Sequence, residues 1–361
     1  MAFILNGKAI GFQAYEKLNE EARSSDLDPQ FVDQIIQLTR DWYNDEVSEF
    51  CFMTSGSTGA PSTVCHSRPS VCKSLDITQK YFGYKRADKS LLALPLKYVA
   101  GSIMLLRALH NDLDLLINNI SSNPFEHLEQ NIDFVAVTPM QLNNCFIKNP
   151  QKLELISAIL LGGSPVSIDM LQSIGSIGSA VYHSYGMTET ITHVALRKLH
   201  GLDATEYYVS ADENIWFECD DDQRLIIHAG HLDGPLLTND VVELLDNKSF
   251  FWKHRWDTVI NSGGIKIHPA EVESYFNREL GLNTLAWGKK DEILGEKLVL
   301  LIESSYDESL IDQIRLKLSQ LELKQRPRLL SFMERFCYTP TMKIDRKCTF
   351  ESIQNENLYQ L

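Results

Sequence analysis

The middle of the chain alternates short apolar runs with amphipathic stretches, and this alternation restricts the fold more than any other feature. The apolar runs of strand length are Ser48–Met53, Ser90–Leu94, Leu113–Ile117, Phe134–Val137, Ala158–Leu161 and Ala180–His183. The stretches with apolar residues at helical spacing are Ser70–Phe82, Val99–Leu109, Met140–Ile147 and Ser167–Ile174. This order predicts an α/β fold in which helices cover a parallel sheet.

The second half of the chain has a different pattern. From Ile215 to Phe251, strand-like runs are separated by Asp-rich turns, which predicts a small antiparallel subdomain. After Asp257 we expect a small α+β domain, with a helix at Pro269–Leu280, a strand at Leu298–Glu303 and a helix over 307–321. We therefore predict a large N-terminal domain, residues 1–256, and a small mobile C-terminal domain, residues 257–361.

Composition and charge exclude several classes of protein. With 44% hydrophobic and 23% charged residues, the chain of 361 residues is typical of a globular protein. Its net charge of −14 argues against a nucleic-acid partner. No apolar run is long enough to span a membrane and the N-terminus lacks the basic start of a signal peptide, so we predict a cytoplasmic protein without membrane insertion.

The cysteines give no sign of a structural framework. Their number is odd, seven, and no two of them form a C-x-x-C pair. This pattern predicts reduced, scattered thiols, with neither a disulfide framework nor a zinc site.

A loop rich in Ser, Thr and Gly follows the first predicted strand. Its sequence is Thr54-Ser55-Gly56-Ser57-Thr58-Gly59-Ala60-Pro61. Such a loop presents backbone N–H groups and hydroxyls to an anion, and its glycines allow a close approach. The spacing differs from that of a P-loop and from that of a dinucleotide-binding fingerprint. By itself, a loop of this composition is most often a flexible turn.

A second polar segment, Ser184-Tyr185-Gly186-Met187-Thr188-Glu189-Thr190, directly follows the last strand of the alternating region. Tyr185 could stack on a purine and Thr188 could bond a phosphate oxygen. Glu189 could coordinate Mg²⁺, which prefers oxygen ligands and substrate phosphates. A simple strand-to-helix turn, with a carboxylate favoured by the helix dipole, explains the same residues.

Three further segments lie later in the chain. Asp240 and Arg255 could hold the paired hydroxyls of a ribose, although solvated loop charges explain them equally well. The double glycine Gly263-Gly264 permits a tight turn or the close passage of a ligand. The basic segment around Lys343 is of a kind that is most often a solvated tail.

Together, in this order and at this spacing, these segments resemble the adenylate-forming superfamily of acyl-CoA synthetases, luciferases and peptide-synthetase adenylation domains. Gly162-Gly163-Ser164-Pro165 adds a further match, to the loop that flanks the adenine and acyl pockets. The resemblance extends from about residue 46 to residue 348. It implies an acid–thiol ligase that uses ATP, Mg²⁺ and coenzyme A to activate a small carboxylate through an acyl-adenylate.

The resemblance also implies a role for each matching residue. The nucleotide would be bound by Thr54, Ser55, Gly56, Ser57, Thr58 and Gly59 at its phosphates, by Gly163, Ser164, Tyr185 and Gly186 around adenine, and by Asp240 and Arg255 at ribose. The catalytic residues would be Thr188 near the α-phosphate, Glu189 on Mg²⁺, and Lys343 at the acyl carboxylate and α-phosphate. Asp257 would be the hinge for domain rotation, and Gly263 and Gly264 would line the pantetheine channel.

Several positions depart from the usual motifs. Ser62 replaces a lysine of the phosphate loop, Asn239 replaces a glycine beside Asp240, and Met342 replaces the glycine before Lys343. The first motif begins much earlier in the chain than in typical relatives, so we expect a trimmed N-terminal subdomain.

Two segments narrow the expected substrate. Leu94–Gly101 and Asn261–Glu273 look like those of the o-succinylbenzoate–CoA ligases of menaquinone biosynthesis, although these usually have Phe-His in place of Lys97-Tyr98. This acid carries a succinyl arm, so a cation is expected in its pocket. Lys97 is the first candidate, followed by Arg107 and His193, and a surface position at a helix start explains Lys97 equally well.

Two alternatives remain open from the sequence. The chain could act on another aryl acid or on a fatty acid. It could also be a non-catalytic nucleotide-binding relative, which the missing lysine at Ser62 suggests, whereas the retention of Lys343 and Glu189 argues for catalysis. The sequence leaves room for a homodimer.

Overall fold

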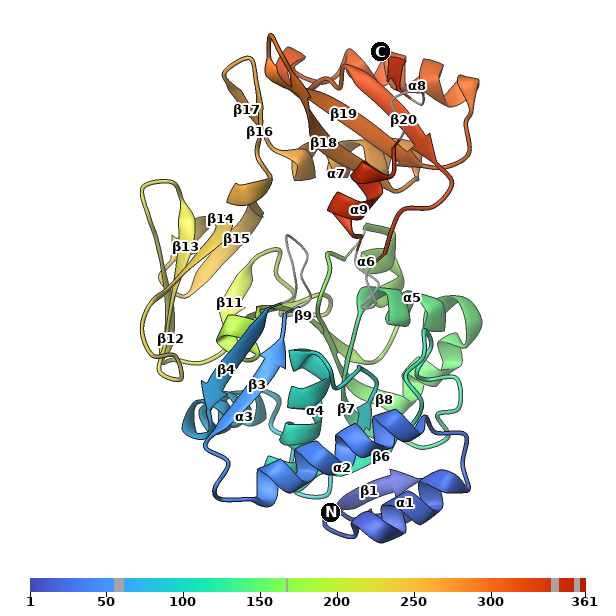
Figure 1. The fold of residues 1–361 in the computed structure, drawn as a ribbon, viewed down its shortest axis with the longest axis vertical. Helices are drawn as coiled ribbons and strands as arrows, with labels where there is room; N and C mark the ends of the chain where they lie inside the picture. The colour runs from blue at the N-terminus through green and yellow to red at the C-terminus, as the bar shows by residue number, and fades with distance from the viewer. Residues whose placement is uncertain (55–61, 167, 339–343, 354–357) are drawn as a thin grey trace.

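The computed structural model describes residues 1–54, 62–166, 168–338, 344–353 and 358–361. Figure 1 shows a larger part, coloured from blue to yellow, and a smaller part in orange and red above it. In the described chain, a 13-stranded sheet organises the larger part and a six-stranded sheet organises the smaller part.

The large sheet has a parallel centre. Its strands lie in the order β12-β13-β14-β15-β11-β10-β9-β8-β7-β5-β6-β1-β2. The parallel strands are β1 (Ala2–Leu5), β6 (Asp114–Ile117), β5 (Lys89–Leu92), β7 (Ile132–Val137), β8 (Ile156–Leu161) and β9 (Ala180–Gly186). The predicted α/β class with a parallel sheet is therefore confirmed.

Antiparallel strands extend both edges of this centre. They are β2 (Lys8–Gly11) at one edge, and β10 (His193–Lys198), β11 (Tyr208–Ser210), β12 (Ile215–Cys219), β13 (Arg224–Ala229), β14 (Leu236–Asp246) and β15 (Ser249–Arg255) at the other. The predicted antiparallel region over 215–251 is thus present, and it continues the large sheet through β11 and β10.

Helices cover both faces of the large sheet. They are α1 (Tyr15–Arg23), α2 (Pro29–Tyr43), α3 (Arg68–Phe82), α4 (Val99–His110), α5 (Pro139–Lys148) and α6 (Ile168–Ile174). Phe134 and Ala136 of β7 pack in the core cluster that contains residues of α1 to α4, whereas Val135 and Val137 pack in the cluster with α5 and α6. This division follows from the alternation of side chains along a strand.

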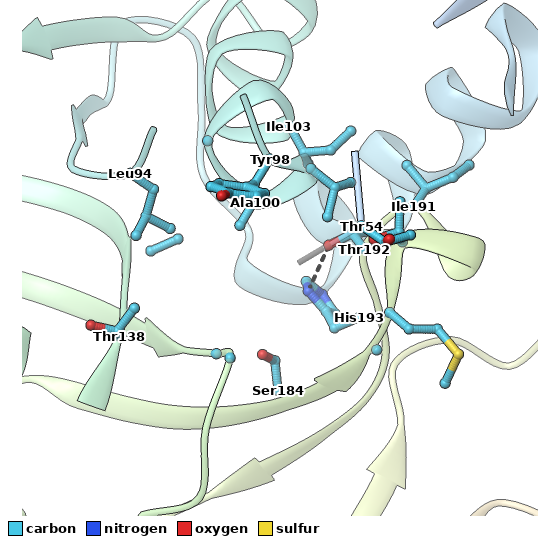
Figure 2. A pocket seen from close by; sticks show the side chains of 18 of the residues that line it. Thr54, Leu94, Tyr98, Ala100, Ile103, Thr138, Ser184, Ile191, Thr192 and His193 are labelled. Carbon is cyan, nitrogen blue, oxygen red and sulfur yellow. Dashed lines mark hydrogen bonds between the residues drawn. The ribbon is translucent and has the colours of Figure 1, made fainter. Parts of the chain in front are cut away.

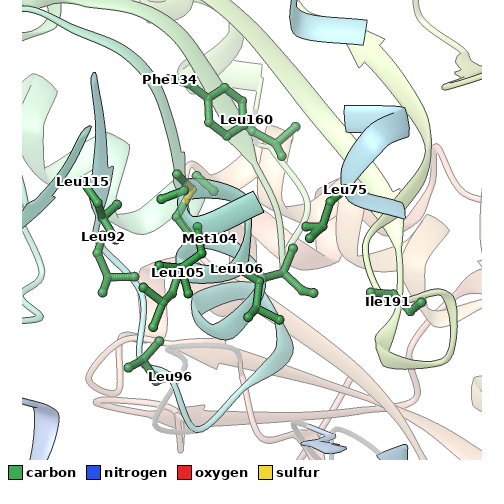
Figure 3. Close-up of a cluster of buried hydrophobic side chains, with 14 of the residues drawn as sticks. Leu75, Leu92, Leu96, Met104, Leu105, Leu106, Leu115, Phe134, Leu160 and Ile191 are labelled. Atoms are coloured by element: carbon green, nitrogen blue, oxygen red, sulfur yellow. The ribbon is translucent and has the colours of Figure 1, made fainter. Parts of the chain in front are cut away.

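Helix α4 lies in the middle of the first core. Residues 101–109 are all buried, and Figure 3 shows its side chains Met104, Leu105 and Leu106 among those of neighbouring elements. A Cβ atom at Gly101 would lie 2.3 Å from the carbonyl oxygen of Pro95, so only glycine allows the helix to approach so closely. None of the described helices combines the length and apolarity needed to cross a membrane.

The smaller part surrounds its own core. Its strands are β16 (Ile260–Ser262), β17 (Ile265–Ile267), β18 (Thr284–Asp291), β19 (Gly295–Glu303), β20 (Leu329–Met333) and β21 (Tyr359–Gln360), with helices α7 (Pro269–Leu280), α8 (Glu308–Leu318) and α9 (Arg346–Glu351). Helix α7 has the predicted bounds, and the other predicted helix and strand overlap α8 and β19. The predicted domain boundary falls between β15 and β16.

Two predictions are wrong in the region of β3 (Glu49–Met53). This strand was expected in the parallel sheet, but it pairs with β4 (Thr63–Ser67) in a separate antiparallel hairpin. Cys51 faces Cys65 across the hairpin, their Cα atoms lie 4.0 Å apart, and the two sulfurs form a disulfide. The expectation that all cysteines are reduced therefore fails, because the pairing depends on the hairpin register, which cysteine spacing does not reveal.

We expect this disulfide to be detectable by thiol titration. Denatured, unreduced protein should show five reactive thiols, and reduction should raise this to the seven cysteines of the sequence. The crosslink closes a short loop, which typically stabilises a fold by about 3 kcal/mol through the entropy of the unfolded chain.

The matched variants Cys51→Ser and Cys72→Ser test the assignment. Cys51→Ser frees Cys65, so this variant should show six reactive thiols both before and after reduction. Cys72→Ser keeps the disulfide and should show four reactive thiols before reduction and six after it. Seven reactive thiols in unreduced wild-type protein would contradict the pairing.

Candidate functional site

A cavity of about 840 Å³ lies at the carboxyl ends of the central strands. Residues that follow β5, β7, β8 and β9 line it, together with residues of α4 and the beginning of β14. In open α/β sheets, ligands bind at this edge because strand ends and loops converge there.

The cavity brings together many of the predicted site residues. Those in its lining are Thr54, Arg107, Gly163, Gly186, Thr188, Glu189, His193, Asp240 and Arg255. Lys97, Ser164 and Tyr185 are not part of the lining, and Asp257, Gly263 and Gly264 lie beyond it toward the smaller sheet. Ser55, Gly56, Ser57, Thr58, Gly59 and Lys343 lie outside the described residues.

Asp240 is held by two aromatic donors. The hydroxyl of Tyr185 donates to its Oδ2 at 2.7 Å, and the indole N–H of Trp252 donates to its Oδ1 at 3.0 Å. Burial, with the nearby charge of Asp240, raises the pKa of Tyr185 well above its ordinary value, so Tyr185 remains a neutral donor. Tyr185 therefore orients the carboxylate from beneath the cavity. Sequence reasoning did not identify Trp252.

Arg255 connects Asp240 to the predicted hinge. Its Nε and Nη2 donate to Asp257 at 2.9 and 2.6 Å, while its Nη1 lies 3.9 Å from Asp240 Oδ1. Asp257 lies in the short 3-10 helix η3 (Trp256–Thr258), between β15 and β16. The link between the two sheets is thus tied electrostatically to the cavity wall.

The loop after β8 is tethered by a buried histidine. His183 Nε2 lies 3.0 Å from the carbonyl oxygen of Ser164, and Tyr208 donates its hydroxyl to His183 Nδ1 at 2.8 Å. Burial lowers the pKa of His183 to about 4, so the ring is neutral and its Nε2–H donates to Ser164. This arrangement holds the Gly163–Ser164 segment beside the cavity.

The acidic turn after β9 is supported from two other elements. Thr188–Thr190 form the short 3-10 helix η2, in which Glu189 faces the cavity and Thr188 is buried. His66 of β4 bonds the carbonyl oxygen of Thr188 at 2.7 Å, and His231 bonds that of Thr190 at 3.2 Å. Both histidines are distant in sequence, which is why motif reading missed them.

Gly186 begins this turn under a steric constraint. A Cβ atom there would lie 2.4 Å from the carbonyl oxygen of Thr192. The backbone of β10 therefore passes directly against Gly186, and any other residue would force the two apart.

Arg107 places a cation at the apolar end of the cavity. Its side chain is only 2% exposed, and its Nη2 donates to Thr192 Oγ1 at 2.6 Å. No carboxylate of the described chain pairs with it, and its Nε is buried without a hydrogen-bond partner. Burial lowers the pKa of the Arg107 guanidinium. A cation of this kind is costly unless an anion accompanies it.

His193 lies beside Arg107 and carries a second unsatisfied nitrogen. Its Nδ1 is 3.1 Å from Thr192 Oγ1, as Figure 2 shows, and its Nε2 is buried without a partner. Burial, together with the charge of Arg107, holds the pKa of His193 well below its ordinary value. Lys97, by contrast, is exposed, with its ammonium 6.0 Å from the centre of the Tyr98 ring.

Comparison with known proteins identifies the family. The model of the AMP-binding enzymes matches residues 11–215, more than half of the chain. This chain is an AMP-binding enzyme. A crystal structure described as an acyl-CoA synthetase (AMP-forming)/AMP-acid ligase II-like protein, from Dyadobacter fermentans, is 32% identical. The match covers 92% of this chain and 97% of that chain, with a TM-score of 0.60.

More distant relatives share the fold over a longer protein. A 2-succinylbenzoate–CoA ligase of Staphylococcus aureus is 23% identical over 84% of this chain, which spans 66% of that relative's length. The o-succinylbenzoate CoA synthetase of Bacillus subtilis, solved with an acyl-adenylate intermediate, is 20% identical with a TM-score of 0.68. This match covers 84% of this chain and 69% of the Bacillus subtilis chain. The likeness establishes a common fold.

The cavity of this AMP-binding enzyme is chemically suited to a nucleotide with a divalent cation. The described residues contain no cluster of three or more metal-ligating side chains. Mg²⁺ is commonly bound by one or two carboxylates together with substrate phosphates, so Glu189 at the cavity surface fits such an ion.

The double glycine of the AMP-binding enzyme forms a tight turn between β16 and β17. Gly263 and Gly264 have φ angles of +60° and +80°, and the N–H of Gly263 donates to Leu294 O at 2.7 Å. Both positions require the left-handed region, which glycine adopts without strain. Glycine at both positions therefore leaves the tip of this turn without side chains.

We expect Trp252→Phe to weaken nucleotide binding. The change removes the hydrogen bond to the Asp240 carboxylate while keeping an aromatic ring. Hydrogen bonds to charged groups contribute about 1.5–3 kcal/mol, so the dissociation constant for ATP should rise about tenfold or more in calorimetric titration.

Trp216→Phe is the matched control, since Trp216 stacks on His228 in the antiparallel strands away from the cavity lining. Its ATP affinity should equal that of the wild type. An unchanged affinity in Trp252→Phe would argue against Asp240 as a nucleotide ligand.

Proposed function

We propose that this AMP-binding enzyme is an ATP-dependent carboxylate–CoA ligase, and that o-succinylbenzoate is its acid substrate. Family membership and the names of the relatives support the reaction class. The observation that carries the substrate proposal is the buried guanidinium of Arg107, which faces the cavity without an acidic partner.

The reaction would proceed in two steps. The acid carboxylate attacks the α-phosphorus of ATP, giving an acyl-adenylate and pyrophosphate. The CoA thiolate then displaces AMP and forms the thioester. Charge develops on phosphate oxygens in the first step, so oriented donors and cations supply most of the catalysis.

The described residues would bind the reactants in distinct places. Asp240 and Arg255 would hold ribose, and Gly163 and Ser164 would lie along adenine. Glu189 would hold Mg²⁺, which when bound neutralises charge on the phosphates. From the resemblance, residues 54–59 would cradle the phosphates and Lys343 would reach the reacting carboxylate.

A second carboxylate distinguishes the proposed substrate from simpler acids. One carboxylate of o-succinylbenzoate would be adenylated while the other would pair with Arg107. Arg346, a partly buried arginine of the smaller part, differs in having a carboxylate partner, because its Nη2 lies 2.5 Å from Glu273 Oε1. Arg107 has none, so a monocarboxylic acid would leave its charge uncompensated in the cavity.

A ligase for an aryl or fatty acid is the second candidate. The apolar side chains of Leu94, Val99 and Ile103 in the cavity lining favour it. Such an acid would occupy the same apolar region without engaging Arg107. The third candidate is a non-catalytic nucleotide-binding protein, because Ser62 replaces the lysine of the phosphate loop. The carbonyl of Ser62 accepts a hydrogen bond from Thr54 N at 2.8 Å and closes the hairpin.

Domain rotation would allow one chain to perform both steps. Asp257 would be the hinge, and Gly263 and Gly264 would line the pantetheine channel afterwards. The ion pair of Asp257 with Arg255 supports this proposal, because it couples the link between the sheets to the nucleotide site. We also propose a cytoplasmic location, where ATP and CoA are available.

We expect Arg107→Gln to impair the use of o-succinylbenzoate selectively. Truncating one partner of a buried charge pair costs about 2 kcal/mol or more, so kcat/KM for this acid should fall at least about thirtyfold. The KM for ATP and any activity on benzoate should remain close to wild type. Pyrophosphate release with a panel of acids, with and without CoA, measures all three.

Arg86→Gln is the control, because Arg86 is an exposed arginine outside the cavity lining. Wild-type activity on benzoate or fatty acids but none on o-succinylbenzoate would overturn the substrate proposal. If no acid of the panel causes pyrophosphate release, the non-catalytic candidate is favoured.

Lys343→Ala should separate the two chemical steps. Lysine at this position would stabilise charge only during adenylation, so pyrophosphate release should fall by about a hundredfold, as for loss of an electrostatic donor. Thioester formation from pre-made acyl-adenylate should continue at the wild-type rate. Equal loss of both steps would contradict the assignment.

A further inference from the structure

The backbone is strained at one point of the cavity wall. Ile191 has φ of +65° and ψ of −58°, and the N–H of Thr192 donates to Thr190 O at 2.7 Å. These values describe a γ-turn of the rarer, strained form. A β-branched residue is an outlier there. Of the described non-glycine residues with positive φ, only Ile191 lines the cavity.

Packing and hydrogen bonds hold this γ-turn in place. The Ile191 side chain is 1% exposed and belongs to the same core cluster as Leu75 and Met104 (Figure 3). Thr190 Oγ1 donates to the carbonyl oxygen of Thr192 at 2.7 Å, and His231 Nε2 lies 3.2 Å from that of Thr190. Strain persists where the surroundings determine the conformation and is concentrated at functional sites.

The γ-turn connects the two ends of the cavity. Glu189, at the proposed metal and phosphate end, lies two residues before Ile191. Thr192, whose hydroxyl accepts from Arg107 at 2.6 Å, lies one residue after it, and His193 follows. Figure 2 shows Ile191, Thr192 and His193 in sequence along one side of the cavity. One γ-turn therefore lies between Glu189 and the threonine that contacts Arg107.

We infer that Ile191 is a positioning residue that sets the length of acid the enzyme accepts. The buried side chain keeps the γ-turn in one conformation, and this fixes the separation between the adenylation end and Arg107. A diacid is used efficiently only when its two carboxylates span that separation. The inference rests on the proposed function and adds a determinant of specificity to it.

Ile191→Gly tests this role. Glycine adopts φ of +65° without strain but has no side chain to anchor, so the turn becomes free to take other conformations. Pyrophosphate release is measured with o-succinylbenzoate and with analogues whose succinyl arm is one methylene shorter or longer. The preference for the best acid, expressed as a ratio of kcat/KM values, should fall at least about fivefold, since one methylene is commonly discriminated tenfold or more.

Two variants separate positioning from simple loss of core packing. Ile191→Val keeps a β-branched anchor and should retain the length preference. Leu18→Ala removes a fully buried side chain of α1 from the same core cluster, outside the cavity lining, and it should lower the melting temperature while keeping the preference. If Ile191→Gly does not fold by circular dichroism, Ile191→Ala is assayed in the same way with the same expected fall.

The outcomes distinguish the inference from the proposed function. A wild-type enzyme that uses none of the three acids refutes the proposed function and the inference with it. A wild-type enzyme that uses them without a length preference, or a folded Ile191→Gly variant that keeps the preference, refutes only the role of Ile191.

Discussion

The hydrogen bond from Arg107 to the hydroxyl of Thr192 connects the helix beneath the cavity to the turn that carries its acidic residue. Two features of the fold bring these residues into contact. Helix α4 reaches its position because Gly101 lets it pass against the Pro95 carbonyl, and β10 reaches its position because Gly186 lets Thr192 approach. Two close backbone approaches, each requiring glycine, thus bring a buried cation to the strand ends.

The cavity lining does not share the strong negative charge of the whole molecule, because it carries Glu189 and Asp240 against Arg107 and Arg255. The chain carries a net charge of −14, yet its described cavity contains a buried guanidinium with no acidic partner. Long-range attraction does not favour an anionic ligand on such a surface, so recognition must rest on short-range pairing in a region of low dielectric. This combination suits discrimination between acids by the position of their charges.

Sequence reasoning was accurate where local periodicity decides structure. The helix at Pro269–Leu280 begins at a proline and ends at a glycine in the left-handed region, and it forms as expected. It failed for β3, whose apolar pattern resembles that of the parallel strands. Tertiary contacts decide which strand a given strand pairs with. Here β3 pairs with β4, which directly follows the Ser/Thr/Gly loop, and not with a strand of the large sheet.

The sequence by itself determined the alternation of helices and strands in the parallel region, the motifs of the family and nine of the residues that line the cavity. Those features depend on neighbours along the chain and on short signatures. Only the tertiary structure decided the Cys51–Cys65 pairing, the support of Thr188 by His66, the orientation of Asp240 by Trp252, and the burial of Arg107 while Lys97 stays exposed. These contacts join separate elements, up to 122 residues apart, and no local pattern encodes such distances.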